Sequence, residues 1–274
     1  MKAARFDYLR PGDVGEALAA LANAEGAKIL AGGQSLGPML NLRLARPALL
    51  VDISRLKALQ QLEDAGRTWH IGAGVTHARL EDARGRLSGG EMLSEVAAAI
   101  AYRSVRNRGT IGGSLAHADP AADWPLALAA LGASVNVRGP TPRKILVAHF
   151  IQGAFTTTLA ADEIIESIDV PKLSRAGRYG FYKFCRKTGE FAEASAAAVL
   201  DPETGVASIF LGALRGIPQP LTSLAQQVAR EGKIAASTEA VSQALAQSVS
   251  GLDAVEHSMA TAVVTRALMQ VLAP

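Results

Sequence analysis

The chain has 274 residues, of which 49% are hydrophobic and 19% are charged, so it can build sizeable cores and is not a disordered protein. Its net charge is only +3, and no basic run is interleaved with aromatic residues, so nothing indicates nucleic-acid binding. Cys185 is the single cysteine, which excludes an internal disulfide and an iron–sulfur cluster held by this chain alone.

The apolar stretches are too short to span a bilayer, so the sequence predicts no membrane span. The first residues, Met1 to Asp7, contain no hydrophobic segment of the kind found in signal peptides. We therefore expect a cytoplasmic location.

The N-terminal part of the chain predicts a helix followed by two strands. A capping-box pattern at Asp13 precedes apolar residues at helical spacing over Val14–Ala24. Short apolar runs at Lys28–Ala31 and Ala48–Ile53 are typical of buried strands.

The middle of the chain alternates predicted strands and helices, with a strongly apolar helix ahead of a polar loop. The expected elements are a strand at Thr68–Ala73, a helix from a Thr76 cap through Leu80, helices at Glu91–Ala101 and Trp124–Leu131, and strands at Ser134–Val137 and Lys144–Val147.

Beyond Pro171 the pattern changes to strands followed by helices. Three strands are expected at Tyr179–Cys185, Ser195–Leu200 and Val206–Leu214, and three helices at Leu221–Glu231, Thr238–Gln247 and His257–Leu272. This order favours an α+β unit with its helices on one face of a small antiparallel sheet.

Two glycine pairs, each soon followed by a hydroxyl residue, are the strongest functional pattern. They are Ala31-Gly32-Gly33-Gln34-Ser35-Leu36 and Thr110-Ile111-Gly112-Gly113-Ser114-Leu115. Each segment is predicted to form a turn, in which glycine lets the main chain approach an anion closely and successive N–H groups can bind its oxygens. Neither segment contains the lysine of a P-loop or a Gly-x-Gly-x-x-Gly motif, so nucleotide hydrolysis and a Rossmann NAD site are not supported. Two matched segments instead suggest one diphosphate held from both sides, as in FAD.

The same motifs resemble those of a known family, the FAD-binding medium subunits of molybdenum hydroxylases of the xanthine dehydrogenase and carbon monoxide dehydrogenase type. The resemblance rests on Ala31–Leu36 with Pro38, Asn41–Leu44 and Leu50–Ile53, on Arg106–Ser114 with Asp119-Pro120 and Asp123, and on Lys183 with Arg186–Glu190. It covers essentially the whole chain, in the order and spacing of the family.

The resemblance implies an α+β fold. It consists of a two-subdomain FAD-binding domain of the vanillyl-alcohol-oxidase type and a small C-terminal domain with a three-stranded antiparallel sheet and three helices. The corresponding boundaries are residues 1–57 and 58–173 for the two subdomains and 177–274 for the C-terminal domain.

The resemblance also implies the residues that bind FAD. The two glycine segments would hold the diphosphate and adjoining ribityl, Asp123 would bond sugar or ribityl hydroxyls, and Lys183 or Lys187 would reach the flavin. The full set is Ala31, Gly32, Gly33, Gln34, Ser35, Leu36, Thr110, Ile111, Gly112, Gly113, Ser114, Ala116, Asp119, Asp123, Lys183 and Lys187. No catalytic residue and no metal ligand is expected in this chain.

The implied function is electron transfer within a complex. Partner subunits would supply the molybdopterin (the large subunit) and two [2Fe-2S] clusters (the small subunit), in a dimer of heterotrimers. This chain would pass electrons to NAD, oxygen, a quinone or another acceptor. The sequence leaves two alternatives open: a self-sufficient FAD-dependent oxidase or reductase, and a non-catalytic nucleotide-binding scaffold subunit.

Other chemistry-bearing residues have plainer interpretations. His117 lies near Asp119 and Asp123, but this spacing matches no standard metal-ligand set, and a position lining the flavin site is preferred. His77 is interpreted as capping or covering a turn. Cys185 lies on an alternating strand and is interpreted as a small buried residue rather than a redox thiol.

Overall fold

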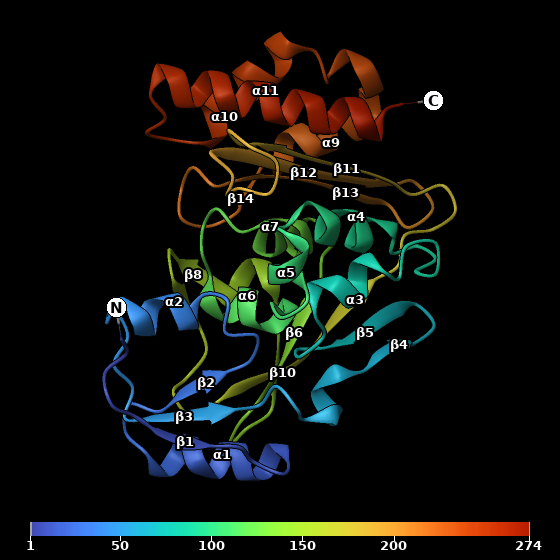
Figure 1. Cartoon of the computed structure of the whole chain (residues 1–274). Helices are drawn as coiled ribbons and strands as arrows, with labels where there is room; N and C mark the ends of the chain where they lie inside the picture. The colour runs from blue at the N-terminus through green and yellow to red at the C-terminus, as the bar shows by residue number, and fades with distance from the viewer. Residues whose placement is uncertain (1, 274) are drawn as a thin grey trace.

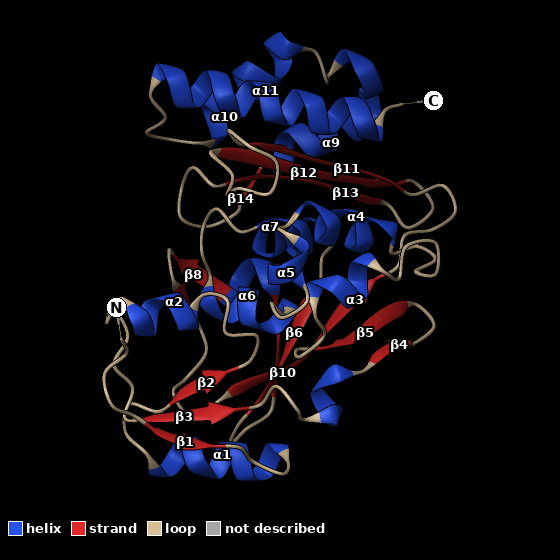
Figure 2. Ribbon diagram, in the orientation of Figure 1, coloured by secondary structure: helices blue, strands red, loops and turns tan. Residues whose placement is uncertain are grey.

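The computed structural model describes residues 2–273, and its three larger sheets follow one another from one end of the molecule to the other (Figures 1 and 2). A small parallel sheet forms the N-terminal end, an antiparallel sheet with surrounding helices forms the middle, and a second antiparallel sheet with three helices forms the opposite end. Each sheet contributes to a separate cluster of buried apolar side chains.

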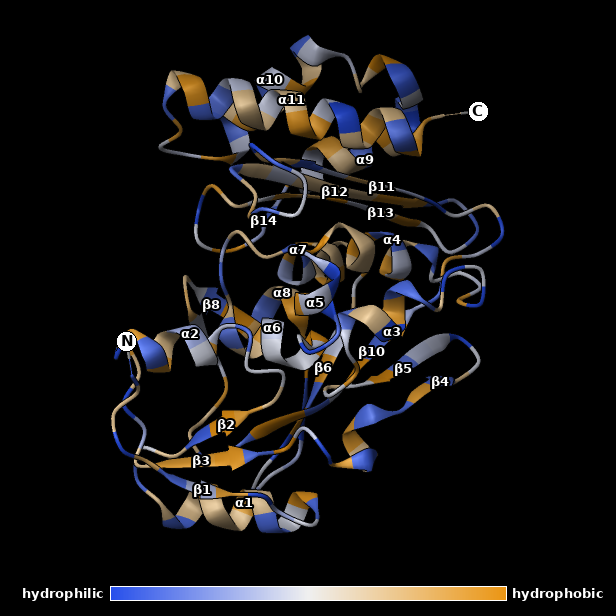
Figure 3. Cartoon of the chain, viewed as in Figure 1, coloured by the Kyte–Doolittle hydropathy of each residue, from blue (hydrophilic) through white to orange (hydrophobic). Residues whose placement is uncertain are grey.

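The N-terminal sheet has the order β1-β3-β2, and both strand pairs are parallel. Its elements are β1 (Asp7–Leu9), α1 (Val14–Asn23), β2 (Lys28–Leu30), α2 (Leu36–Asn41) and β3 (Leu49–Asp52). Strand β3 is hydrophobic from Leu49 to Val51, as its orange colour in Figure 3 shows, and ends at Asp52; α1 buries its apolar face nearby. The first glycine segment connects β2 to α2 and therefore lies at the carboxyl end of a parallel strand.

The central sheet has five strands in the order β4-β5-β10-β6-β7, and all of its pairs are antiparallel. Its strands are β4 (Leu62–Asp64), β5 (Thr68–Gly72), β6 (Ser134–Arg138), β7 (Arg143–Leu146) and β10 (Ile164–Pro171). Strand β10 occupies the middle of the sheet, although the sequence analysis did not identify it. Its partners β5 and β6 come from earlier, separate parts of the chain, so no local pattern marks the pairing.

Helices cover the central sheet on the side that faces the C-terminal end (Figure 1). These are α3 (His77–Glu81), α4 (Glu91–Ala99), α5 (Arg103–Arg106), α6 (Ile111–His117), α7 (Asp123–Ala130) and α8 (Val147–Phe150); the shorter elements are η1 (Lys57–Gln60), β8 (Ile151–Gly153) and β9 (Thr156–Thr157). Helix α7 is buried on every side, and Trp124 in its first turn is completely inaccessible.

The C-terminal sheet lies between two layers of helices. Its strands are β11 (Arg178–Phe184), β12 (Ala194–Asp201), β13 (Val206–Gly212) and β14 (Gln219–Pro220), followed by α9 (Thr222–Glu231), η2 (Gly232–Ile234), α10 (Thr238–Ser248) and α11 (Ala254–Val271). Alternate residues of β12 face opposite layers: Ala197 belongs to the central core, whereas Ala196 and Ala198 belong to the C-terminal core. The expected sheet of three strands thus has a fourth, two-residue strand, because Gln219 and Pro220 pair with the end of β13.

The second glycine segment also differs from its expected form. The glycine pair predicts a turn, but Ile111–His117 forms helix α6, with Thr110 as its N-cap. The Thr110 hydroxyl accepts a hydrogen bond from the Gly113 N–H at 3.0 Å, as a capping threonine does. The glycines therefore lie in the first turn of a helix rather than in a loop.

Candidate functional site

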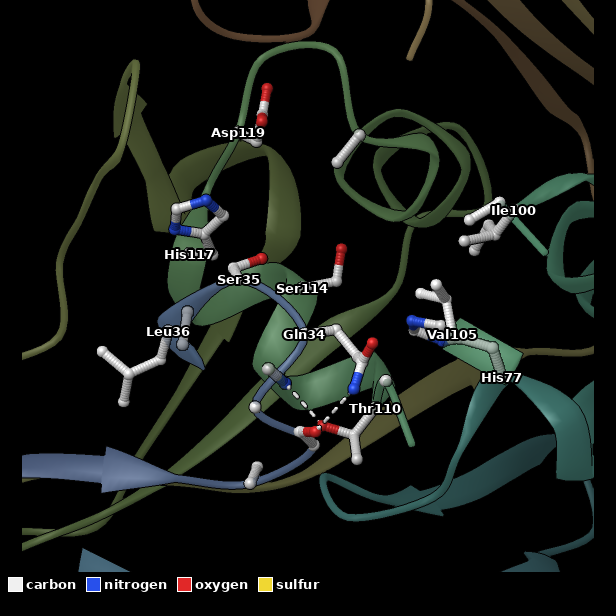
Figure 4. A pocket seen from close by; sticks show the side chains of 18 of the residues that line it. Gln34, Ser35, Leu36, His77, Ile100, Val105, Thr110, Ser114, His117 and Asp119 are labelled. Carbon is white, nitrogen blue, oxygen red and sulfur yellow. Dashed lines mark hydrogen bonds between the residues drawn. The ribbon is translucent and has the colours of Figure 1, made fainter. Parts of the chain in front are cut away.

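A cavity of about 480 Å³ lies where three separate parts of the chain meet. The segment 28–45 contributes the first glycine segment, and the segment 77–123 contributes α6 and the end of α4. The segment 183–191 contributes the end of β11 and the loop that follows it. Figure 4 shows Gln34, Ser35 and Ser114 directed into the space between these segments.

The first glycine segment offers unpartnered main-chain donors to this cavity. Within residues 2–273, no protein acceptor takes the N–H groups of Gly32, Gly33, Gln34 or Ser35. Gly33 has a φ of +72°, a conformation that glycine adopts without strain. Polar main-chain groups that lack protein partners at a cavity wall suit an anionic ligand.

The second glycine segment presents different chemistry. The N–H of Ile111 donates to Val75 O and that of Gly112 to Ala73 O, both at 3.0 Å. Those of Gly113 and Ser114 donate to the side chain and main chain of Thr110. These four N–H groups already have acceptors within the protein. Only the first glycine segment therefore has main-chain N–H groups without protein acceptors, and the two segments are not matched in this respect. The second segment contributes the Ser114 hydroxyl, and its Gly113, which has no side chain, lets a ligand approach the main chain closely.

The two glycine segments lie against each other, as the sequence predicted. A Cβ added to Gly32 would lie 2.1 Å from Arg108 O, so only glycine fits beneath the chain that leads into α6. A Cβ added to Gly113 would lie 2.8 Å from Thr110 Oγ1 and 4.0 Å from the Cβ of Ala31. One ligand can therefore contact both segments at once.

A buried ion pair forms the wall farther from the N-terminal sheet. Lys183 Nζ lies 2.9 Å from Asp123 Oδ2 and donates to Ala99 O at 3.1 Å, and both side chains are less than one-tenth exposed. Asp123 Oδ1 has no hydrogen-bond partner. Burial raises the pKa of Asp123 and the charge of Lys183 opposes that rise. A buried oxygen without a partner at a cavity wall suits a ligand donor such as a hydroxyl or ring N–H.

His77 also lines the cavity, from the N-terminus of α3. Trp124 Nε1 donates to His77 Nδ1 at 3.0 Å, so the proton of the neutral ring resides on Nε2. Burial, with a smaller contribution from the charge of Arg106, lowers the pKa of His77 to about 4. The side chain is therefore a neutral donor at physiological pH.

The end of the cavity near Lys183 is closed by a strained turn and the loop after β11. Ala101 has a φ of +41°, and Arg106 donates to both Ile100 O and Ala101 O at 2.8 Å. Gly189 packs on this turn, where an added Cβ would lie 2.8 Å from Ala101 O. Arg106 thus fixes the shape of a wall that sequence motifs do not describe.

Most of the predicted site residues line this one cavity. They are Ala31, Gly32, Gly33, Gln34, Ser35, Leu36, Thr110, Gly113, Ser114, Ala116, Asp119, Asp123 and Lys183. Three predicted residues do not line it. Ile111 is fully buried in the central core, Gly112 packs against Ala73, and Lys187 is exposed.

Several cavity residues were not predicted as site residues, and most of them come from outside the motifs. They are Lys28, Met39, Ala45, His77, Ile100, Ala101, Val105, Gly109, His117, Ala122, Gly189, Glu190 and Phe191. His117 had been interpreted as a flavin-site position. Ile100 and Ala101 carry no local signal, because their place at the cavity depends on how α4 ends.

No helix among residues 2–273 is long and apolar enough to cross a membrane. Over the same residues, no group of three or more His, Cys, Asp or Glu side chains is arranged to hold a metal ion.

Comparison with known proteins identifies related sequences. Residues 4–173 match the family model described as the FAD binding domain in molybdopterin dehydrogenase. The chain is 42% identical over 202 residues to the 6-hydroxypseudooxynicotine dehydrogenase complex subunit alpha of Paenarthrobacter nicotinovorans, covering 73% of this chain and 68% of that protein. It is 39% identical over 201 residues to the carbon monoxide dehydrogenase medium chain of Hydrogenophaga pseudoflava, covering 72% of this chain and 69% of that one.

Solved structures share the whole fold. A chain of reconstituted CO dehydrogenase from Oligotropha carboxidovorans superposes with a TM-score of 0.90 at 30% identity, covering 100% of this chain and 99% of that one. A chain of quinoline 2-oxidoreductase from Pseudomonas putida 86 gives a TM-score of 0.88 at 30% identity, covering 99% of this chain and 98% of that one.

Proposed function

Because this chain belongs to the family of FAD-binding domains in molybdopterin dehydrogenases, we propose that it is the electron-transfer subunit of a heteromeric molybdenum-dependent hydroxylase. In this proposal it takes electrons from [2Fe-2S] clusters of a partner subunit and passes them to NAD, oxygen, a quinone or another acceptor. The observation that carries the proposal is the cavity in which free N–H groups of the first glycine segment and the unpartnered Asp123 Oδ1 lie together.

The donor set of this cavity supports FAD as its occupant. The free N–H groups of Gly33, Gln34 and Ser35, with the Ser114 hydroxyl, suit a diphosphate, since hydrogen bonds to charged acceptors are the strong ones. Asp123 Oδ1 suits a ribityl or ring donor. FAD, when bound, supplies electron exchange singly or in pairs, which can join one-electron clusters to a two-electron acceptor.

The protein's own side chains would set the environment of that ligand. Lys183 holds the Asp123 carboxylate in one orientation, which leaves Oδ1 free to accept a bond from the ligand. The Gly189 loop, packed on Ala101, would limit the access of water to this end of the cavity. Of the two lysines suggested by the sequence, the proposal now favours Lys183 because Lys187 is exposed and outside the cavity lining.

We further propose the assembly. The relatives include proteins named as medium chains, and this chain has a single cysteine. A large molybdopterin-binding subunit and a small [2Fe-2S] subunit, in a cytoplasmic dimer of heterotrimers, would complete the enzyme. We retain the division into residues 1–57, 58–173 and 177–274, which is supported by the three sheets and their separate cores.

Lysine substitutions test the site. We expect Lys183→Met to lower FAD affinity at least tenfold, because it leaves the Asp123 carboxylate buried and unpaired, whereas Lys187→Met should retain wild-type affinity. Ser114→Ala, which removes only a hydroxyl, should lower the affinity for FAD by about tenfold. This second variant tests the site even if the Lys183→Met protein does not fold. FAD content is measured from visible absorbance after gel filtration. Wild-type content in both Lys183→Met and Ser114→Ala would refute the site.

Copurification tests the assembly. The chain is expressed in its native operon with an affinity tag, and the copurifying chains are identified by mass spectrometry together with molybdenum and iron content. We expect two further polypeptides that carry both metals. Turnover of an organic substrate by the isolated chain would favour a self-sufficient oxidase or reductase, and purified protein without a reducible visible band would favour a scaffold.

A further inference from the structure

A second cavity, of about 450 Å³, lies on the other side of the first glycine segment. It shares Ala31, Gly32 and Thr110 with the flavin cavity, so these residues form a wall between the two. Its remaining lining comes from the end of β3, from the turn before α3 and from the chain leading into α6. The proposed FAD site does not use this space.

Positive charge is concentrated in the second cavity. Four arginines line it (Arg10, Arg55, Arg79 and Arg108), against a single carboxylate, Asp52. Asp52 already accepts hydrogen bonds from Tyr8 and from the Ser54 N–H, and it lies 3.7 Å from Arg10. The cavity therefore keeps an excess of cationic donors over acceptors.

Two of these arginines have no acceptor of their own. Within residues 2–273, the guanidinium groups of Arg55 and Arg108 make no hydrogen bond or ion pair with the protein. In contrast, Arg79 donates to Gln60 O. A guanidinium group can bind a phosphate through two parallel N–H bonds, and two free groups at one cavity suit two phosphates.

Two neutral side chains that line the cavity keep donor groups without a protein acceptor. Asn107 Oδ1 accepts from Arg103 Nε at 3.1 Å, which leaves the Asn107 amide NH₂ available. Thr76 Oγ1 accepts from the Arg79 N–H at 3.2 Å, which leaves its hydroxyl proton free to donate. A cavity lined by several polar donors is typical of a small-molecule site rather than of a flat protein interface.

We propose that this second cavity is a binding site for a diphosphate, either as the free anion or as the diphosphate of a nucleotide. Arg55 and Arg108 would bind the phosphate oxygens, and Asn107 and Thr76 would donate neutral hydrogen bonds. The proposal does not require FAD to be bound, because the arginines of the second cavity do not line the flavin cavity.

Calorimetric titration tests the site. The purified protein is first saturated with FAD and then titrated with inorganic pyrophosphate, with ADP and with inorganic phosphate at low ionic strength. We expect one pyrophosphate per chain and weaker binding of phosphate. Equal affinity for pyrophosphate and ADP would identify the anion itself as the ligand, whereas tighter binding of ADP would identify a nucleotide.

Substitutions locate the bound anion. Arg55→Gln with Arg108→Gln should weaken pyrophosphate binding at least tenfold, while Arg230→Gln, an exposed arginine on α9, should leave it unchanged. Each single variant is measured as well, and circular dichroism checks that all of them fold. Absence of binding by FAD-saturated protein, or equal binding by wild type and all arginine variants, would overturn the proposal.

Discussion

His77 shows how one buried side chain links the flavin cavity to the stability of the fold. Its ring is neutral, accepts from Trp124 and has a pKa near 4, below its value of about 6.5 in an unfolded chain. The contribution of neutral His77 to the free energy of unfolding is fully present above pH 6.5. It is lost as the pH falls toward 4, because the unfolded chain then binds a proton at His77 that the native protein does not. We therefore expect the free energy of unfolding to fall by about 2 kcal/mol from this group between pH 7 and 4.5.

The matched variant for this prediction is His77→Gln. A glutamine carbonyl can still accept from Trp124 but cannot titrate, so its urea-unfolding free energy should depend less steeply on pH over the same range. The difference between the two profiles removes the contribution of carboxylates that both proteins share. Parallel profiles for wild type and variant would show that the His77 pKa is not lowered.

Strand β11 and helix α11 illustrate packing that tolerates no side chain. A Cβ added to Gly180 would lie 2.0 Å from Ala267 O, a main-chain atom that can move only if the helix moves. We expect Gly180→Ala to lower the free energy of unfolding by about 1–3 kcal/mol, as overpacked sites do, measured by urea denaturation. Gly153→Ala is the control, because its Cβ would meet no atom closer than 3.8 Å. Equal stability of the two variants would contradict the close approach of β11 and α11.

Elements with local patterns were predictable from the sequence, and elements defined by distant partners were not. Helices α4 and α7 were expected within two residues of their observed ends, because the apolar residues of each helix lie within one segment. Strand β10 was missed because Ile168 pairs with Ile71 and Val135, far away in the chain. Helix α6 was taken for a turn because two glycines disfavour a helix, whereas the Thr110 cap and contacts with Ala73 and Val75 hold its first turn.

For the molecule as a whole, the sequence identified the glycine segments and the Asp123–Lys183 pair of the cavity but missed the part of its wall that Ile100, Ala101 and His77 form. Glycine segments have recognisable local chemistry, so residues such as Gly33 and Ser114 could be named from the sequence. Ile100 and His77 line the cavity only because Arg106 and Trp124 hold them there, and such contacts depend on the complete fold. The sequence also could not predict that the N–H groups of the first glycine segment lack protein acceptors while those of the second have them, because the acceptors lie on parts of the chain that only the tertiary structure brings together.

The shared wall between the two cavities predicts that their ligands influence each other. Gly32 packs directly on Arg108 O, and Ala31, Gly32 and Thr110 line both spaces, so the arginines lie across one layer of main chain from the proposed FAD diphosphate. Filling the second cavity would neutralise their positive field. We expect saturating pyrophosphate to weaken FAD binding about 5-fold at low salt, with less effect at 0.15 M, where charges are screened within about 8 Å.

The shape of the titration separates coupling from competition. When the FAD dissociation constant is measured by flavin fluorescence at increasing pyrophosphate, coupling through the wall gives a plateau, whereas displacement from the flavin cavity gives an increase without limit. The double variant Arg55→Gln with Arg108→Gln should lose the plateau effect, because it lacks the guanidinium groups that bind the anion. By reciprocity, FAD must weaken pyrophosphate binding by the same factor, and calorimetry on protein with and without FAD measures that factor independently. An FAD dissociation constant that rises without limit would show competition for one site, and an unchanged constant would show that the wall does not couple two separate sites.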